Sequence, residues 1–176
     1  MRLLSSQQAP NFSLTDYQGN NINLQEYAGK KVLLSFFRGA ACPFCNLRVN
    51  QLINRYDEFV ISEIQVLIFF AATGEEIFQY AGQQQAPFSI IPDPQEDIYK
   101  KYGIESSHSG MFKAMIQPFK MMSMMSSGFF NLKSMRDKPL IPADFLINRD
   151  QTIHQAYYGK DFGDHLSIDR ILEWAK

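Results

Sequence analysis

The chain of 176 residues contains two cysteines, Cys42 and Cys45, separated by two residues. This Cys-x-x-Cys spacing is typical of redox-active pairs, in which one thiol attacks and the other closes a disulfide. Residues three apart in an α-helix have Cα atoms about 5 Å apart, and a disulfide accepts about 4.4–6.8 Å. The two cysteines can therefore form a disulfide without unwinding a helix.

The pair lies where a strand is expected to turn into a helix. The apolar run 32–37 has the length and composition of a strand buried on both faces of a sheet. After it, apolar side chains recur at helical spacing from Cys45 onward and predict one long helix that ends near Phe59. Cys45 lies on the inward stripe of this helix, so we expect its thiol to be buried.

Cys42 is expected at the N-terminus of that helix. Pro43 suits the first helical turn, where its missing N–H costs nothing, and this leaves Cys42 at or next to the N-cap. Free backbone N–H groups and the helix dipole favour an anion there, and Arg38 adds a second positive charge. We expect the pKa of Cys42 to lie below its ordinary value of about 8.5. Cys42 is then the exposed, ionised attacking thiol, and Cys45 is the buried resolving thiol.

Two other uses of the cysteines are weaker. A structural disulfide that closes so short a loop would constrain the unfolded chain very little. A zinc site needs about four ligands, whereas the chain has no second Cys-x-x-Cys and its histidines, His108, His154 and His165, are scattered. We expect no metal and no other cofactor, and we interpret the histidines as surface or loop residues.

The composition predicts one soluble globular domain over residues 1–176. Hydrophobic residues make up 45% and charged residues 20%, and the length suits one packed core rather than two. A net charge of −1 gives no field that would attract nucleic acid or anionic lipid. No signal-peptide core opens the chain, and no run approaches the ~18 apolar residues of a membrane span. We predict a cytoplasmic protein, where a cysteine pair serves catalysis rather than cross-linking.

The remaining elements complete an α/β pattern. Residues 9–24 alternate apolar and polar side chains around a Gly-Asn turn and predict a hairpin. The run 64–71 predicts a second buried strand, parallel to the first. Further along we expect a helix over 73–83 with a capping box, a strand at 88–91, a helix at 96–102, two antiparallel strands over 139–148 and 152–158, and a closing helix capped by Ser167 or Asp164.

Residues 106–138 interrupt this pattern. Seven of the eight methionines fall here, at positions 111, 115, 121, 122, 124, 125 and 135. We interpret the segment as a helical insertion, kinked or divided at Pro118, that caps the core. Two alternatives are an adaptable apolar lid over the thiol and a contact surface for a partner or for the second subunit of a homodimer. A methionine copper site is less favoured than either.

The order of elements and several motifs resemble the thioredoxin fold in its peroxiredoxin-like branch, the alkyl hydroperoxide reductase and thiol-specific antioxidant family. The matching residues are 9–14, the Gly19 turn, 24–37, Cys42 with Pro43, and 145–150. The resemblance implies a central mixed sheet flanked by helices. It also implies that Cys42 is the peroxidatic cysteine, which attacks a peroxide and becomes a sulfenic acid. Cys45 would condense with it to a disulfide that thioredoxin, glutaredoxin or glutathione reduces.

The chain departs from the family's pattern at three positions. Ser35 stands at the proline of the family's motif, and Gly39 stands at the threonine whose hydroxyl holds the peroxide. Pro142 replaces an arginine before the late strand, at the position where thioredoxins carry a cis-proline beside the disulfide. We consider a cis bond there, because it costs only about 0.5–1 kcal/mol more than trans. Arg38 is the candidate substitute for the absent arginine.

The leading prediction is a thiol-based antioxidant oxidoreductase that reduces peroxides, with Cys42, Cys45, Arg38 and Pro142 as its catalytic set. The Cys-Pro-Phe-Cys motif also resembles the glutaredoxin active site, so a dithiol–disulfide oxidoreductase acting on protein or glutathione disulfides is the alternative. A third hypothesis is a redox-inert interaction protein that binds through the methionine-rich segment. We expect Asp144 to pair with a lysine or a loop amide rather than to move protons for the thiols.

Overall fold

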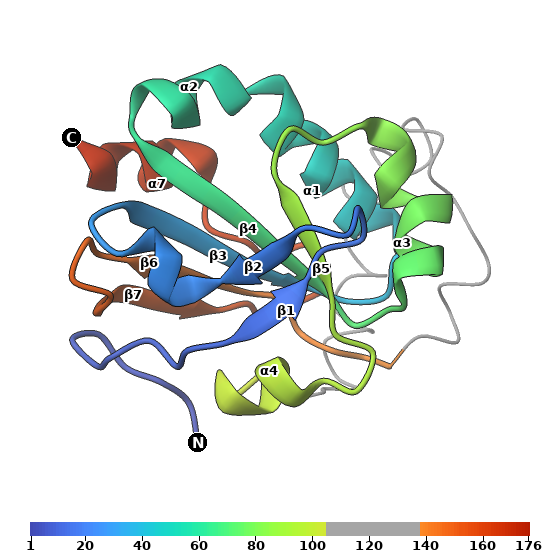
Figure 1. Cartoon of the computed structure of the whole chain (residues 1–176), viewed down its shortest axis with the longest axis horizontal. Helices are drawn as coiled ribbons and strands as arrows, with labels where there is room; N and C mark the ends of the chain where they lie inside the picture. Colours follow the sequence, from blue (N-terminus) through green and yellow to red (C-terminus); the bar gives the residue numbers. More distant parts are fainter. Residues whose placement is uncertain (105–137) are drawn as a thin grey trace.

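The computed structural model describes residues 1–104 and 138–176. Its centre is a five-stranded mixed sheet in the order β5-β4-β3-β6-β7 (Figure 1). The strands are β3 (Lys31–Phe37), β4 (Ile64–Phe70), β5 (Ser89–Pro92), β6 (Ala143–Ile147) and β7 (Ile153–Tyr158). The central strand β3 pairs in parallel with β4 and antiparallel with β6. This arrangement confirms the predicted α/β class with a mixed sheet.

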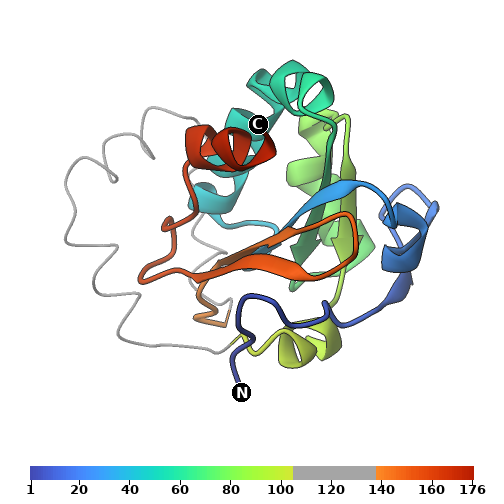
Figure 2. The same cartoon turned by 90° about the vertical axis from the view of Figure 1, so that its left-hand side faces the viewer.

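Helices cover both faces of this sheet. In Figure 1, α1 (Pro43–Asn54), α2 (Tyr56–Ile61) and α7 (Ile168–Ala175) lie above the sheet, and α4 (Asp97–Lys101) lies below it. Figure 2 shows the same two layers from the side, with the N-terminal segment on the α4 side. Alternate residues of β3 enter the two cores: Leu33 and Phe37 pack with α1 and α7, whereas Leu34 and Phe36 pack with α4. The strand is thus buried on both faces, as its apolar run predicts.

The long helix expected to end near Phe59 is divided in two. Arg55 leaves the helical region, with φ −115° and ψ 16°, and separates α1 from α2. The break shifts the phase of the apolar stripe. Phe59 is therefore buried, whereas Val60, which continues the stripe in the sequence, is 56% exposed. A helical period read from the sequence cannot detect such a phase shift.

Smaller elements hold the edges of the sheet. The predicted hairpin is formed by β1 (Ser13–Thr15) and β2 (Asn21–Asn23), followed by the short helix η1 (Leu24–Tyr27). The predicted capping box of Thr73 and Glu76 opens α3 (Gly74–Gln79), but the chain then continues as a separate short helix, η2 (Ala81–Gln84). Ser167 caps α7 through its side chain.

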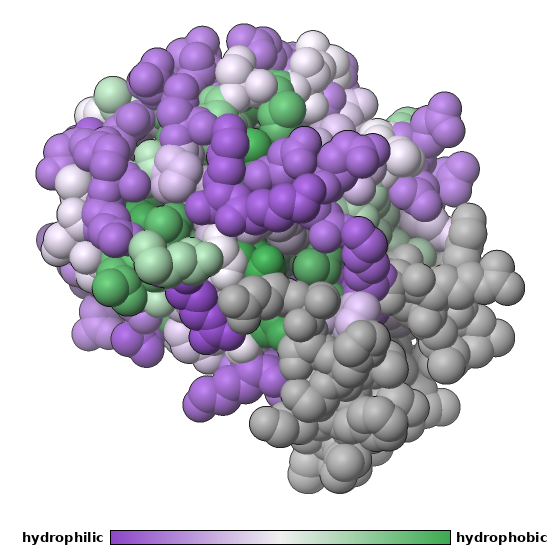
Figure 3. Space-filling view, turned by 90° about the horizontal axis from the view of Figure 1, so that it is seen from below, coloured by the Kyte–Doolittle hydropathy of each residue, from purple (hydrophilic) through white to green (hydrophobic). Residues whose placement is uncertain are grey.

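The methionine-rich insertion predicted over 106–138 lies outside the described residues, apart from Lys138 at its end. The strand expected over 139–148 is shorter at its start, because two prolines in its first four residues lack the N–H groups that a ladder needs. Seen from below, the surface is mainly hydrophilic, with apolar side chains between the polar ones (Figure 3). None of the helices in the described ranges combines the length and the hydropathy that crossing a membrane requires.

Candidate active site

Cys42 occupies the N-cap of α1, and Pro43 follows in the first helical turn, as predicted. The N–H of Cys42 donates to the carbonyl of Gly39 (3.1 Å), and its own carbonyl accepts the N–H of Asn46 (3.0 Å). Backbone N–H groups of Phe44 and Cys45 point at the Cys42 sulfur. The turn of the helix therefore surrounds this sulfur with donors, which favours its charged form.

The two thiols have opposite tendencies to ionise. A hydrogen bond from the Cys45 thiol is the main cause that lowers the pKa of Cys42 to about 7, and burial opposes this effect. The positive charge of Arg38 and the backbone N–H groups lower it further. Burial, followed by the interaction with Cys42, raises the pKa of Cys45 well above its ordinary value. Near neutral pH about half of the Cys42 sulfur is therefore thiolate, while Cys45 stays a neutral thiol that donates to it.

The expectation that Cys42 is exposed is wrong. Its exposed fraction is 0%, that of Cys45 is 1%, and both are free thiols. Cys42 packs in the same apolar cluster as Phe37 and Ala40. The position at a helix N-cap can be inferred from Pro43, but the burial of the side chain depends on a cluster that also includes residues of β4, α3 and α7.

Arg38 is directed at the thiolate by contacts on either side. Its Nη1 lies 3.8 Å from Sγ of Cys42, its Nε donates to the carbonyl of Lys138 (3.3 Å), and its guanidinium lies 3.8 Å from the centroid of the Phe162 ring. Arg38 is only 5% exposed. A buried guanidinium held in this way stabilises the thiolate form of Cys42.

Residues 6–156 match the AhpC/TSA family. The chain belongs to this family. Its membership confirms the resemblance inferred from the sequence and the predicted enzyme class, a thiol-based antioxidant peroxidase. Enzymes of the AhpC/TSA class act on a peroxide and are regenerated by a thiol reductant.

Individual relatives agree with the AhpC/TSA assignment. The chain is 28% identical to Peroxiredoxin Bcp of Escherichia coli over 105 residues, which cover 60% of this chain and 67% of the relative. Among solved structures, Peroxidoxin BcpB from Mycobacterium tuberculosis superposes with a TM-score of 0.73 at 14% identity, covering 99% of this chain and 97% of the other. A DsbE-type thiol:disulfide interchange protein from Chlorobium tepidum gives 0.67 at 17% identity, covering 99% of each. These two structural likenesses show the fold.

The structure shows what Gly39 and Pro142 do at two of the positions where the chain departs from the AhpC/TSA pattern. Gly39, at the family's threonine position, serves the turn through its carbonyl. Pro142 is not cis, because the described residues contain no cis peptide bond, so that expectation is wrong. Its carbonyl accepts the N–H of Gly159 (2.9 Å) and extends the contact between β6 and β7 beyond the strands. These contacts hold Pro142 in place on the β7 side of β6.

Sequence reasoning missed a polar cluster in the core behind α1. The carboxylate of Asp144 accepts hydrogen bonds from the Ser35 hydroxyl and from the N–H of Leu166 (2.7 Å), and it lies 3.0 Å from Nδ1 of His165. Asp144 thus pairs with a loop amide, as expected, and not with a lysine. His165 lies in the loop before α7, which agrees with its interpretation as a surface or loop residue, but its side chain is buried and not at the surface. His165 follows Asp144 by 21 residues, and no local pattern signals their contact.

The other two histidines differ from His165. His154 is exposed and stacks on the ring of Trp174, with centroids 5.7 Å apart, which agrees with a surface role. His108 lies outside the described residues.

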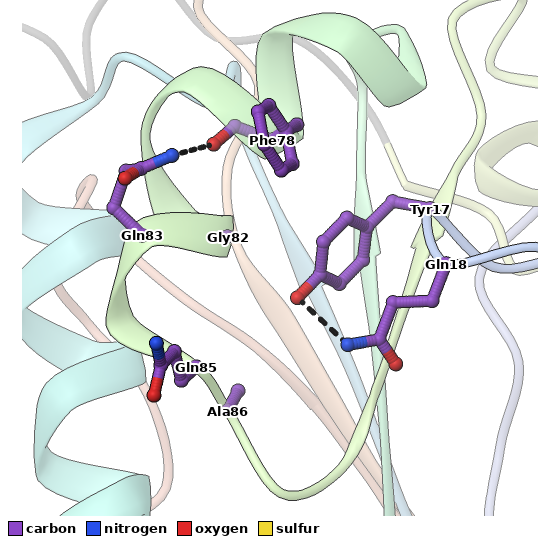
Figure 4. A pocket seen from close by; sticks show the side chains of 7 residues that line it. All are labelled: Tyr17, Gln18, Phe78, Gly82, Gln83, Gln85 and Ala86. Atoms are coloured by element: carbon purple, nitrogen blue, oxygen red, sulfur yellow. Dashed lines mark hydrogen bonds between the residues drawn. The ribbon is translucent and has the colours of Figure 1, made fainter.

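A pocket of ≈ 580 Å³ opens between the β1–β2 turn and the segment that joins α3 to β5 (Figure 4). Its lining residues are Tyr17, Gln18, Phe78, Gly82, Gln83, Gln85 and Ala86. The ring of Tyr17 packs closely on Gly82, where an added Cβ would lie 3.0 Å from the ring. The lining contains side-chain amides and aromatic rings but none of the four predicted catalytic residues.

Proposed function

We propose that the protein reduces peroxides with Cys42 as the attacking thiolate and Cys45 as the resolving thiol. The thiolate attacks one peroxide oxygen, the O–O bond breaks, and the leaving alkoxide or hydroxide takes up a proton. Cys42 is then a sulfenic acid. Cys45 attacks this sulfur, a molecule of water leaves, and an intramolecular disulfide remains. The observation that carries the proposal is that Cys42 is the N-cap of α1, three residues before Cys45, with Nη1 of Arg38 3.8 Å from its sulfur. The pKa of Cys42 is lowered and that of Cys45 raised, which agrees with this division of roles.

Arg38 takes the role of the missing arginine in this proposal. Its Nη1 lies 3.8 Å from the Cys42 sulfur, so its charge is placed to stabilise the negative charge that passes from the sulfur to the leaving oxygen. Gly39 supplies no hydroxyl for this purpose, so donors to the peroxide come from Arg38 and from the backbone at the start of α1. Pro142 stays a predicted member of the site, and its proposed role is to support the start of β6.

The reductant in this proposal is a cytoplasmic thiol, supplied by thioredoxin, glutaredoxin or glutathione. A disulfide within one helical turn can be opened by a small thiol or by a protein dithiol, provided that α1 loosens at its start. A cytoplasmic location fits the proposed reaction, because a disulfide that must be reduced to two free thiols in each cycle needs a reducing compartment. A homodimer also remains part of the proposal, with the methionine-rich segment as its candidate contact.

Stopped-flow oxidation of the reduced protein by hydrogen peroxide tests the assignment of the two cysteines. We expect oxidation much faster than that of free cysteine, loss of this reaction in Cys42→Ser, and a trappable sulfenic acid without a disulfide in Cys45→Ser. A rate equal to that of free cysteine that is unchanged in Cys42→Ser would overturn the proposal. Disulfide exchange as the main activity has no further support, since the likeness to the DsbE-type protein shows the fold alone.

A further inference from the structure

The turn that carries Cys42 is held by a side chain that the proposed chemistry does not use. Asn46, one turn into α1, is 3% exposed. Its Nδ2 donates to two carbonyls at once, that of Ala40 (2.7 Å) and that of Cys42 (3.0 Å). Ala40 lies in the irregular backbone between β3 and α1, and Cys42 is the N-cap of α1, whose carbonyl also accepts the backbone N–H of Asn46 (3.0 Å).

Asn46 is itself held from outside the helix. Gln84, at the end of η2, donates its Nε2 to the carbonyl of Asn46 (3.2 Å) and to its Oδ1 (3.3 Å). This second contact fixes which way the Asn46 amide points, because Oδ1 faces a donor and Nδ2 faces the two carbonyls. Residues on both sides of Gln84 line the pocket of Figure 4, so Gln84 joins that surface to the redox turn.

We propose that Asn46 is a positioning residue that, oriented by Gln84, fixes the backbone of residues 40–42 and thereby the place of the Cys42 sulfur. Asn46 acts through the backbone, and no contact of its side chain with the sulfur is involved. The side chain of the N-cap residue Cys42 makes no capping hydrogen bond, so the Asn46 amide orders the start of α1 instead. The inference deepens the proposed function and rests on it for its consequence in catalysis.

The position of the sulfur matters because its charged form depends on short-range donors. Its pKa is lowered by the hydrogen bond from Cys45, by the charge of Arg38 and by the backbone N–H groups of Cys45 and Phe44, and burial opposes these effects. Hydrogen bonds weaken steeply with distance and angle. A small displacement of residues 40–42 therefore removes stabilisation of the thiolate even when Arg38 and Cys45 are unchanged.

The test is the pH titration of thiolate absorbance in the reduced protein, with Cys42→Ser identifying the signal. Asn46→Ala should move the midpoint up by about one pH unit, which is a tenfold loss of thiolate below the midpoint. Gln84→Ala should move it in the same direction by less. Asn50→Ala is the matched control and should leave the midpoint unchanged. Asn50 lies one turn further along α1, and the hydrogen bond described for its side chain is with the exposed Asn54.

A merely structural role predicts a different result. In that case Asn46→Ala lowers the denaturant midpoint, but the midpoint of the thiolate titration stays that of the wild type and the rates of peroxide oxidation across pH stay within twofold. This result would overturn the inference. If Asn46→Ala does not fold, Gln84→Ala decides in the same way, since Gln84 is partly exposed and not part of α1. A wild type that oxidises no faster than free cysteine would refute the proposed function but leave the titration to decide this inference.

Discussion

Nη1 of Arg38 lies 3.8 Å from Sγ of Cys42, and both side chains are buried. At this separation and burial the guanidinium favours the thiolate more than it would at a surface. It is nevertheless a smaller influence than the hydrogen bond from Cys45, which is the largest cause of the lowered pKa of Cys42. Two groups thus prepare one sulfur, and their contributions can be separated by substitution.

Replacing Arg38 by methionine should raise the pKa of Cys42 and slow its oxidation by hydrogen peroxide at neutral pH by about tenfold or more. Methionine keeps much of the apolar contact with Phe162 but removes the charge. Stopped-flow rates across pH measure the effect. Arg149→Met is the control, because Arg149 pairs with Glu63 at the surface. Equal rates for wild type and Arg38→Met would exclude Arg38 from the chemistry.

The oxidation rate should rise with pH through about 7, where Cys42 ionises, and then level off. Cys45→Ala removes the strongest donor to the sulfur, so its midpoint should lie at a higher pH. Cys45→Ser keeps a donor and should shift the midpoint less than Cys45→Ala does. The measurement is the pH dependence of the first oxidation step, and an unchanged midpoint in Cys45→Ala would contradict the assigned hydrogen bond.

Asp144→Asn should destabilise the fold by about 1–3 kcal/mol, because it removes a buried carboxylate that accepts from the Ser35 hydroxyl and from the N–H of Leu166 and that lies 3.0 Å from Nδ1 of His165. Urea unfolding measures this. Asp169→Asn is the control: Asp169 is exposed where it pairs with Arg55, and such pairs contribute about 0–1 kcal/mol. Equal midpoints for the two variants would show that the buried cluster does not stabilise the fold.

The same carboxylate gives the stability a pH dependence of known sign. Burial acts to raise the pKa of Asp144, but His165, Arg48 and the Ser35 hydroxyl together hold it below its ordinary value. A group with a lowered folded pKa contributes its stability above its unfolded pKa of about 3.9, and this contribution is lost as the pH falls through the folded value. Unfolding curves recorded from neutral to acidic pH should show a steeper loss in wild type than in Asp144→Asn.

Tyr99→Phe should cost about 1–3 kcal/mol. The Tyr99 hydroxyl donates to the carbonyl of Phe37 (2.6 Å) at the end of β3, and both groups are buried. Phenylalanine preserves the ring contact with Phe36 and leaves the carbonyl without this donor. Denaturant unfolding measures the change. An unaltered stability would mean that the freed carbonyl finds another donor when the hydroxyl is absent.

Local chemistry made much of the site predictable. Pro43 after an apolar strand fixed Cys42 near a helix N-cap, and Thr73 with Glu76 signalled the start of α3, because each of these features depends on residues within one turn. The burial of Cys42 and the contact of Asp144 with His165 depend on segments brought together by the sheet. The hydrogen bond from Gln84 to Asn46 joins residues that are 38 positions apart in the sequence. Such contacts leave no periodic trace in one sequence.

The complete burial of Cys42 has a consequence for selectivity. A sulfur that is ionised yet enclosed discriminates among oxidants by their dimensions before it discriminates by their chemistry. Hydrogen peroxide is small enough to pass through narrow gaps between side chains, whereas a bulky lipid hydroperoxide requires a larger local opening of the protein. We therefore expect hydrogen peroxide to oxidise Cys42 faster than a bulky hydroperoxide does, and large alkylating reagents to react with it slowly.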